Sequence, residues 1–492
     1  MLKKPNWFHG SIAAIILIAV LLVSALPQQQ SIAGAENGYY GKKAKYVFFF
    51  IGDGMAMPQI NSTEIFKGAL DSTNPMSKGN LALTSLPYQG MQTTYSANTF
   101  ITESAAAGTA LATGYKTNND VLGMDPTKTI KLKSMAEMAK AAGMKVGIVS
   151  TVSLDHATPA AFYAHEPTRK NYYEIAASMI NSDFDYFAGG GLLAPAGSKK
   201  DRPNILDLAG SKGYKVVNTK DGILNLTQKD GKIIAICPDL AAEAAMNYDI
   251  DRRDQVSLQD LTRKGIEMLD NPSGFFMMVE GGKIDWSCHA NDAGTTVRDV
   301  LAFDNAVTEA LQFYAKHPNE TLIVITGDHE TGGMTIGFAG TNYETFFSKI
   351  KQQSVSFEEF DKKIKIYRTA VTPEYANLDD WMPFLTYQIG LTNLTDHDKS
   401  RLEAALAASM MDPKKRNTDE NSRLLYGSYE PFSVTVTHIL NQKAGIGWTT
   451  YAHTGIAVPV FAQGVGGSLF QGYYDNTDIA KKMMNIMGVT FQ

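Results

Sequence analysis

Short runs of apolar residues recur along the chain, and stretches with a helical pattern separate most of them. Runs of about four to eight apolar residues bounded by turn residues are typical of buried strands. The first run, at residues 46–51 (YVFFFI), ends at a Gly-Asp-Gly turn centred on Asp53. Further strands are predicted at residues 145–150, 184–188, 232–237, 275–279, 322–326 and 458–462.

The helical stretches between these strands determine the predicted fold class. At residues 133–142, for example, Ser134 and Glu137 have the spacing of a capping box at the start of a helix. Alternation of strands and helices along a chain favours a parallel sheet with helices on both faces. The sequence therefore predicts an α/β fold with a doubly wound, largely parallel central sheet flanked by helices. In such sheets, ligands bind beyond the carboxyl ends of the strands.

One segment, at about residues 338–449, has a different pattern. It is charged and poor in strand-like runs, and helices are predicted within it at residues 357–366, 378–390 and 396–411. The chain then returns to the earlier pattern just before His453. We interpret the segment as a helical insertion into one domain at residues 36–492, where it shapes access to a site or builds an interface.

The first residues have the pattern of an export signal. Lys3 and Lys4 precede an uncharged apolar run at residues 11–26, and small residues at 33–35 offer a cleavage site. The run is shorter than the roughly 20 apolar residues that a membrane-spanning helix needs. We expect residues 1–35 to be a cleaved signal peptide, with a retained anchor as the alternative. The protein is then exported to the periplasm or the extracellular space, with no membrane contact after cleavage.

Composition and charge narrow the class of protein. The 492 residues are 44% hydrophobic and 19% charged, which is typical of a globular protein with a large core. The formal net charge of −5 predicts no surface for nucleic acids. An exported protein could join its two cysteines, Cys237 and Cys288. We expect no such disulfide, because Cys288 lies inside a cluster of acids and histidines.

Acids and histidines gather at the ends of the predicted strands. Three strands are followed by such residues, and another histidine precedes the last strand: Asp53; Glu280, Asp285 and His289; Asp328 and His329; and His453. Carboxylates and imidazoles are the ligands that zinc and magnesium require. One such motif alone would be typical of a turn or a buried polar pair. Together they indicate a metal site at one edge of the sheet.

The segment around Ser104 is a second candidate, with the sequence TESAAAGTA at residues 102–110. Small residues follow the serine in a stretch that permits a helix, which would place Ser104 at a helix N-terminus. Free backbone N–H groups and the helix dipole favour an anion there. Small side chains would also let a phosphate and metal ions approach closely. Alone, the segment is more typical of a serine that caps a tightly packed helix.

These motifs together resemble the alkaline phosphatase family. The matching stretches span residues 44–470 in the order of the family: IGDGM, TESAAAGTALATGYKTNNDVLGMD, HATPAAFYAHEPTR, VEGGKIDWSCH, TGDHETGG and AHTG. The resemblance implies an enzyme that hydrolyses phosphate monoesters at alkaline pH through a covalent phosphoserine. It also implies two Zn²⁺ and one Mg²⁺ per chain, and a homodimer.

The resemblance implies a role for each candidate residue. Ser104 would be the nucleophile, Arg169 would bind the phosphate, and Glu103 would support that arginine. The metal ligands fall into three sets: Asp285, His289 and His453 for one zinc; Asp53, Asp328 and His329 for the other; and Asp53, Thr158 and Glu280 for magnesium, beside His156. The chemistry agrees, because zinc activates oxygen nucleophiles and the planar fork of arginine matches two phosphate oxygens. His165 is interpreted as structural.

Three positions depart from one common pattern of the family. Glu103 stands where an aspartate usually precedes the nucleophile, so we expect a less rigid support of Arg169. His156 and Trp286 stand where some members have aspartate and lysine, and other members vary at both. A neutral imidazole adds no negative charge and can itself bind zinc, so we expect weak magnesium binding. Trp286 supplies no cation to a bound phosphate.

Two other functions fit parts of this pattern. One is a related hydrolase, a phosphodiesterase or a sulfatase. Residues 104–108 lack the C/S-x-P-x-R signature of sulfatases, and diesterase relatives commonly use threonine as the nucleophile. The other is an exported protein that binds metal or phosphate without turnover. The presence of both Ser104 and Arg169 argues against it, and small phosphate monoesters remain the predicted partners.

Overall fold

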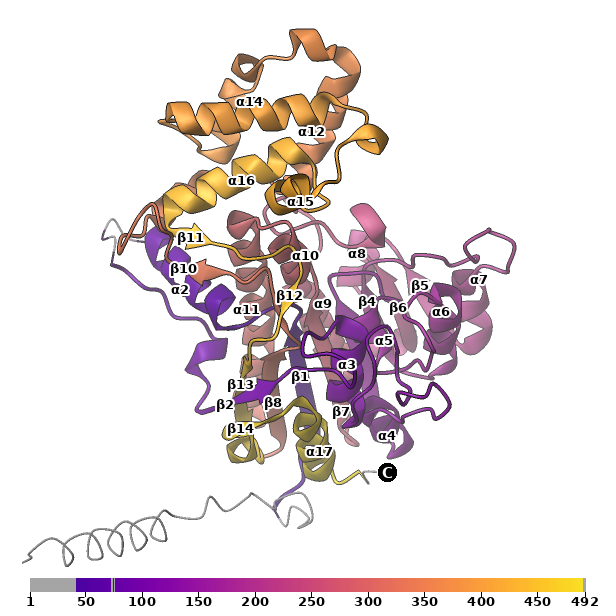
Figure 1. Ribbon diagram of the computed structural model, residues 1–492. Helices are drawn as coiled ribbons and strands as arrows, with labels where there is room; N and C mark the ends of the chain where they lie inside the picture. The colour runs from indigo at the N-terminus through magenta and orange to yellow at the C-terminus, as the bar shows by residue number, and fades with distance from the viewer. Residues whose placement is uncertain (1–40, 72–73, 75, 490–492) are drawn as a thin grey trace, which may run out of the picture. The chain divides into compact units, whose positions relative to one another are not determined.

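The computed structural model of the protein describes residues 41–71, 74 and 76–489 (Figure 1). The predicted signal peptide at residues 1–35 lies outside these described residues and stays a prediction. Across the described ranges, no helix is long and apolar enough to cross a membrane.

A ten-stranded sheet forms the centre of the described chain, in the order β14-β2-β13-β8-β1-β7-β3-β4-β6-β5. Its strands are β1 (Tyr46–Gly52), β2 (Tyr88–Thr93), β3 (Lys145–Ser150), β4 (Tyr186–Gly189), β5 (Tyr214–Val217), β6 (Lys232–Ile236), β7 (Phe275–Gly281), β8 (Thr321–Gly327), β13 (Val458–Gly464) and β14 (Gly472–Asp475). From β8 to β5 all neighbours are parallel, whereas β13 runs antiparallel to both β8 and β2. The largely parallel α/β sheet predicted from the sequence is confirmed.

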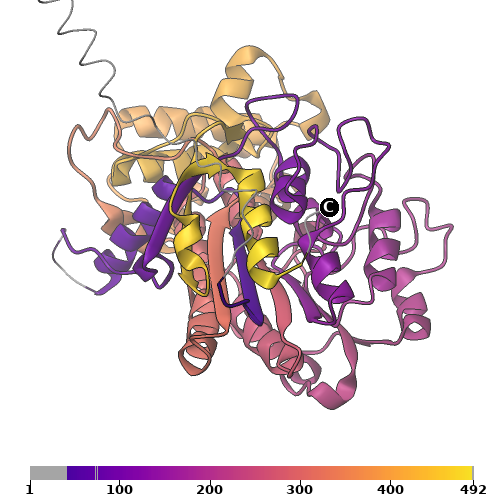
Figure 2. The same cartoon turned by 90° about the horizontal axis from the view of Figure 1, so that it is seen from below.

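Helices cover both faces of this sheet (Figures 1 and 2). They are α2 (Met57–Asp71), α3 (Ser104–Thr113), α4 (Met135–Ala141), α5 (Ala157–Ala160), α6 (Tyr172–Asn181), α7 (Ile205–Ala209), α8 (Lys220–Leu224), α9 (Leu258–Leu269), α10 (Lys283–His289), α11 (Ala293–Lys316) and α17 (Asn476–Met487). The predicted capping box of Ser134 and Glu137 is present at the start of α4.

Strand β1 shows why the central strands are apolar throughout. Phe48 and Phe50 pack into the cluster that contains Phe303 of α11, whereas the ring of Phe49 meets Phe162 beyond α5. Successive side chains of a strand point to opposite faces, so a strand covered on both faces must be apolar at every position. All seven residues of β1 are buried.

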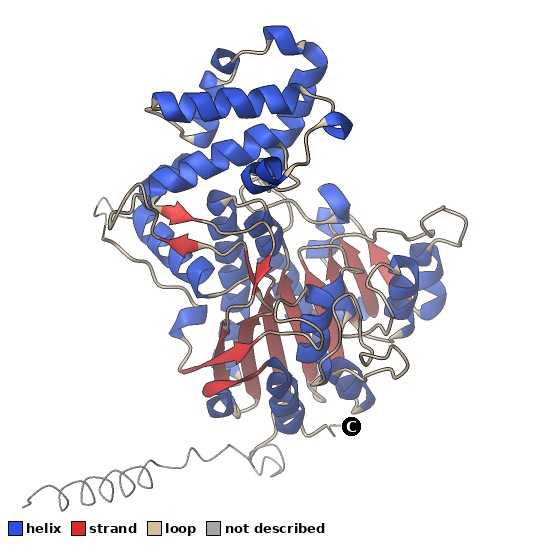
Figure 3. Ribbon diagram, viewed as in Figure 1, coloured by secondary structure: helices blue, strands red, loops and turns tan. Residues whose placement is uncertain are grey.

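Residues 338–449 are mostly helical, as predicted (Figure 3). Their hydrophobic cluster, which includes Phe360, Leu402 and Phe432, also takes in Phe66 of α2 and Val297 of α11. The main helices are α12 (Phe357–Ala370), α14 (Asp396–Met410), α15 (Glu420–Tyr426) and α16 (Pro431–Ala444). The helix predicted at residues 378–390 is present as a series of short helical pieces: a 3₁₀ turn at Leu378–Asp380, α13 (Met382–Phe384) and a π-helical turn at Leu385–Ile389. Pro383, which has no N–H group, lies within that series. The boundaries of the insertion stay a prediction.

Candidate active site

Strand register brings the candidate ligands together. β1 lies between β7 and β8, and Gly52 is paired with both Gly281 and Gly327. Because these parallel strands end at the same level, the residues that follow them emerge at one edge of the sheet. His453 reaches the same place from far along the chain, because β12 (His453–Thr454) pairs with β9 (Glu330–Thr331).

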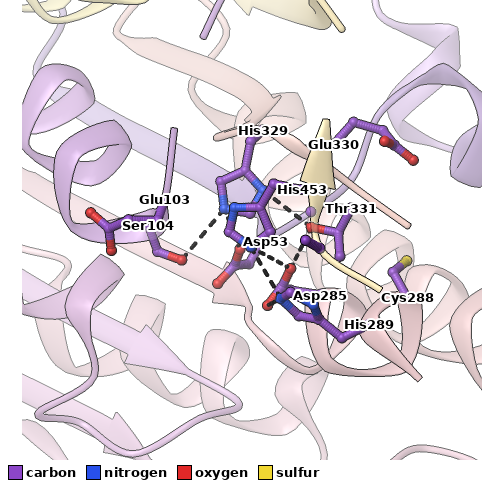
Figure 4. A network of polar contacts seen from close by, with 12 residues as sticks. Asp53, Glu103, Ser104, Asp285, Cys288, His289, His329, Glu330, Thr331 and His453 are labelled. Atoms are coloured by element: carbon purple, nitrogen blue, oxygen red, sulfur yellow. Dashed lines mark hydrogen bonds and ion pairs between the residues drawn. The ribbon is translucent and has the colours of Figure 1, made fainter. Parts of the chain in front are cut away.

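The three side chains of the first predicted zinc set lie close together (Figure 4). The Nε2 atoms of His289 and His453 lie 3.1 Å apart, and they lie 3.3 and 3.6 Å from carboxylate oxygens of Asp285. Each imidazole donates its Nδ1–H to a backbone carbonyl, at Tyr451 for His289 (2.6 Å) and at Thr102 for His453 (2.8 Å). A proton fixed on Nδ1 leaves the lone pair of Nε2 free for a metal ion.

The second predicted zinc set surrounds His329. Its Nε2 atom lies 3.3 Å from an oxygen of Asp53 and 3.3 Å from an oxygen of Asp328, and all three side chains are fully buried. Asp285 also approaches Asp53 and His329, which links this set to the first. Ser104 is the first residue of α3, and its hydroxyl lies 3.4 Å from His329 Nε2.

The third set combines Asp53, Glu280 and His156, whose ligand atoms lie within 4.8 Å of one another. Thr158 is fully buried, and no hydrogen-bond partner reaches its hydroxyl. Ser150 donates a short hydrogen bond to Glu280. His156 Nε2 accepts a hydrogen bond of 2.9 Å from Arg169, which brings the third set next to the predicted phosphate ligand.

Unpartnered buried atoms show that these sets fit cations. Both carboxylate oxygens of Asp53, one oxygen each of Asp328 and Glu280, and Nδ1 of His156 are buried without a hydrogen bond. Burial and the neighbouring carboxylates raise the pKa of Asp53 and of Asp328, and burial raises that of Glu280 to about 7. Buried carboxylates without counter-charges cost several kcal/mol. Oxygen and imidazole ligands around divalent ions would remove that cost.

Glu103 holds the serine helix and the arginine together. It is the N-cap of α3, and its carboxylate accepts from the backbone N–H groups of Ala105, Ala106 and Asp120 at 3.0, 2.8 and 2.9 Å. The same carboxylate accepts a 2.5 Å hydrogen bond from Arg169. Although burial opposes it, Arg169 together with these N–H groups keeps the pKa of Glu103 below its usual value.

Sequence reasoning missed Thr331, which lies inside a recognised motif but was given no role. Its hydroxyl donates to Asp285 at 2.5 Å and lies 3.2 Å from His329 Nδ1, so it connects the two predicted zinc sets. A polar residue three positions after Asp328 was the available signal. The carbonyls of Tyr451 and Thr102 gave no signal, because every residue has one. Cys237 and Cys288 are both buried and free, as expected.

Groups that could bind an anion and groups that could bind cations therefore lie around the start of α3, where Ser104 approaches His329 and Glu103 bonds to Arg169. A helix N-terminus and an arginine attract an anion, while the buried carboxylates need divalent cations. That combination defines a metal-dependent hydrolase of anionic esters.

Comparisons with known proteins agree with this class. The family model for alkaline phosphatase matches residues 44–489. Alkaline phosphatase 4 of Bacillus subtilis (strain 168) is 33% identical over 506 residues, which cover 99% of each chain. The structure of a cold-active alkaline phosphatase from a psychrophilic Shewanella sp. has a TM-score of 0.74 and 32% identity, covering 90% of this chain and 99% of that one. A histidine-to-glutamate variant of the alkaline phosphatase from the Antarctic bacterium TAB5, with Mg bound in its M3 site, has a TM-score of 0.64 and 26% identity, over 92% and 99% of the two chains.

The chain belongs to the alkaline phosphatase family. It is a metal-binding enzyme that hydrolyses phosphate monoesters.

Proposed function

We propose that Ser104 is the nucleophile and that it carries the phosphoryl group during turnover. The observation that supports this role most strongly is the position of Ser104 at the N-terminus of α3, with its hydroxyl 3.4 Å from His329. The serine oxygen bonds to phosphorus as the bond from phosphorus to the alcohol oxygen breaks. Water then attacks the phosphoserine, and phosphate and the free serine are released.

Arg169 holds the phosphate and Glu103 holds Arg169. One terminal nitrogen of Arg169 donates to Glu103 and the other to His156, so the plane of the guanidinium is fixed at two points. Each terminal nitrogen has a second N–H group, and the planar fork matches two phosphate oxygens. The free N–H groups at the start of α3 add to the binding of the anion.

Two Zn²⁺ and one Mg²⁺ per chain complete the proposed site. The first zinc set is Asp285, His289 and His453; the second is Asp53, Asp328 and His329; and the magnesium set is Asp53, Thr158 and Glu280, with His156 beside it. When bound, zinc would lower the pKa of the serine hydroxyl and offset negative charge on the leaving oxygen. Loss of that proton becomes easier as the pH rises, which favours activity at alkaline pH.

His156 would limit magnesium at the third set. Its imidazole brings no negative charge to a set that otherwise consists of oxygen ligands. The TAB5 variant, in which a glutamate replaces a histidine, has Mg bound in its M3 site. It supports the proposal that a carboxylate in place of His156 would tighten magnesium binding here.

The proposal also covers the location of the protein in the cell, its domain organisation and its oligomeric state. Residues 1–35 would be a cleaved signal peptide that directs the protein to the periplasm or the extracellular space. The mature chain would be a domain at residues 36–492 with a helical insertion at about 338–449, and it would form a homodimer. The basic start and apolar run of the sequence support export, and the resemblance to the family supports the dimer.

Acid quench with a radiolabelled aryl phosphate tests the nucleophile. Phosphate should be trapped on Ser104, and Ser104→Ala should lose at least about 10³-fold in kcat. Ser134→Ala is the matched control, because Ser134 also lies at the start of a helix, as the N-cap of α4, but is not part of the proposed site. It should retain the label and lose only stability. Label on another residue, or full activity of Ser104→Ala, would refute the assignment. Assays with a diester and a sulfate ester test the two related hydrolase activities.

A further inference from the structure

Lys283 is a buried cation next to the site that none of the roles above uses. It is the first residue of α10, two positions before Asp285, and its side chain is 1% exposed. Its ammonium donates to Glu358 of α12 at 3.2 Å. The other oxygen of Glu358 accepts from the backbone N–H of Ala242 at 3.1 Å. The ion pair therefore joins the helical segment at residues 338–449 to the helix that carries the first zinc ligands.

The ammonium of Lys283 also lies over two aromatic rings. It is 3.7 Å from the ring centre of Tyr248 and 4.7 Å from that of Trp286. Trp286 is three residues further along α10, so both side chains leave the same face of the helix. A cation within about 6 Å of an indole face is attracted to it, and the attraction is stronger when water is excluded. The charge of Lys283 thus restricts the orientation of Trp286.

Trp286 passes this restriction to the phosphate ligand. Its ring meets the ring of His156 edge-on, with centres 6.0 Å apart and planes at 71°. His156 in turn accepts the 2.9 Å hydrogen bond from Arg169. A continuous set of contacts therefore runs from Glu358 through Lys283, Trp286 and His156 to Arg169.

We propose that Lys283 is a positioning residue for Arg169, and that through it the helical segment at residues 338–449 sets the affinity of the enzyme for phosphate. The inference rests on the proposed function of Arg169. Trp286 stands where some family members have a lysine, but the cation is not lost from this helix. It lies one turn earlier, where it acts on the indole ring and not on the phosphate.

Because Lys283 is buried, its charge is costly, and we infer that it does something that an apolar side chain could not do. A buried ammonium is costly unless it is paired, and a well-packed apolar side chain would hold α10 and α12 together at least as well. A charge, unlike an apolar group, has a preferred direction of approach to an indole face. Removing it should loosen Trp286 and His156 more than it loosens the helices.

A double-mutant cycle tests this inference on the metal-loaded enzyme. Lys283→Met removes the charge and keeps most of the stem, and Trp286→Phe removes the indole. Each should raise KM and the inhibition constant of inorganic phosphate roughly tenfold, with a smaller change in kcat. If Lys283 acts through Trp286, Lys283→Met should have little further effect in the Trp286→Phe background. Lys283→Arg, which retains the cation, should restore phosphate inhibition to within about threefold of wild type.

Fluorescence gives a readout that a merely structural role would not change. The emission of Trp286 is the difference between the wild type and Trp286→Phe, and it should shift in Lys283→Met and return in Lys283→Arg. Lys264→Met is the matched control, because Lys264 of α9 is also buried and paired with a carboxylate, Glu267. It should lower the melting temperature and leave both phosphate inhibition and emission unchanged.

The outcomes separate this inference from the proposed function. If Lys283→Met changes only the melting temperature, or has the same effect on phosphate inhibition in both backgrounds, the inference is wrong. If Arg169→Ala leaves phosphate inhibition unchanged, the proposed role of Arg169 is wrong as well. Should Lys283→Met fail to fold, Lys283→Met with Glu358→Gln leaves neither charge of the pair and supports the same cycle.

Discussion

Glu103→Gln is the most informative single change, because four donors share the two oxygens of this carboxylate. One oxygen accepts from Ala106 and Asp120, and the other accepts from Ala105 and Arg169. The amide of glutamine has nearly the same shape but only one oxygen. Whichever way it turns, two of the four donors face an NH₂ group and lose their hydrogen bonds.

The expected loss has two parts. The orientation that keeps Arg169 bonded gives up two backbone hydrogen bonds, one from Ala106 in the first turn of α3 and one from Asp120 in the loop that follows α3. Each is worth about 1 kcal/mol, and both N–H groups are left unsatisfied. We therefore expect the free energy of unfolding to fall by about 2–3 kcal/mol. The bond to Arg169 also loses its charge. Both side chains are about one-fifth exposed, so solvent reduces this part to about 1–1.5 kcal/mol, or roughly tenfold in kcat/KM.

Urea unfolding and aryl phosphate kinetics measure the two parts separately. Glu103→Asp keeps the charge but moves the carboxylate back by about 1.5 Å, so it should change KM or phosphate inhibition more than stability. Asp304→Asn is the control, because Asp304 also accepts from two backbone N–H groups, at Ala82 and Leu83. It should change stability alone. Unchanged KM and phosphate inhibition in both Glu103 variants would remove Glu103 from the phosphate site.

Three further predictions follow from the geometry. Chelation should abolish activity and zinc should restore it, and His453→Ala should lower the bound zinc measured by elemental analysis; undiminished zinc would show that His453 is not a ligand. His156→Asp should tighten magnesium binding in equilibrium dialysis, and an unchanged affinity would contradict the role of His156. Despite burial, Glu137 raises the pKa of His165 and His165 lowers that of Glu137, at a distance of 3.0 Å. The stability that Glu137 contributes is present above about pH 4.5 and is lost as the pH falls. The stability that His165 contributes is present below about pH 6.5 and is lost as the pH rises. His165→Gln should therefore lower thermal stability most near about pH 5.5, by about 1 kcal/mol, and less at about pH 9. An equal loss at both pH values would refute this explanation.

The central strands could be predicted from the sequence and the edge strands could not. β1, β7 and β8 are covered on both faces, so each is an unbroken apolar run. β2 (YQGMQT) and β14 (GYYD) lie at one edge of the sheet, and most of their residues are exposed or half-buried. Such strands need no apolar run, and neighbouring strands rather than local pattern determine them.

In the candidate site, too, some features could be predicted from the sequence and others could not. The metal-binding residue types at strand ends could be recognised, because the carboxyl ends of parallel strands share one edge. What could not be predicted is the set of contacts that orients them. The backbone carbonyl of Thr102 fixes the tautomer of His453 from 351 positions away in the chain, and Glu358 pairs with Lys283 across 75 positions. Contacts of this kind depend on the packing of whole elements and leave no local signal.

The Gly-Asp-Gly turn after β1 shows how closely fold and site depend on each other. Asp53 belongs to the set around His329 and to the set around Glu280, and both of its oxygens lack a hydrogen bond, so each is free for a different cation. Gly54 has a φ of +71°, which favours glycine, and a Cβ there would lie 2.9 Å from the Cα of Asp285. The N–H of Gly54 also donates to Asp328 at 3.1 Å. A larger residue at Gly54 would therefore push apart the ends of β1, β7 and β8, and with them all three sets of ligands.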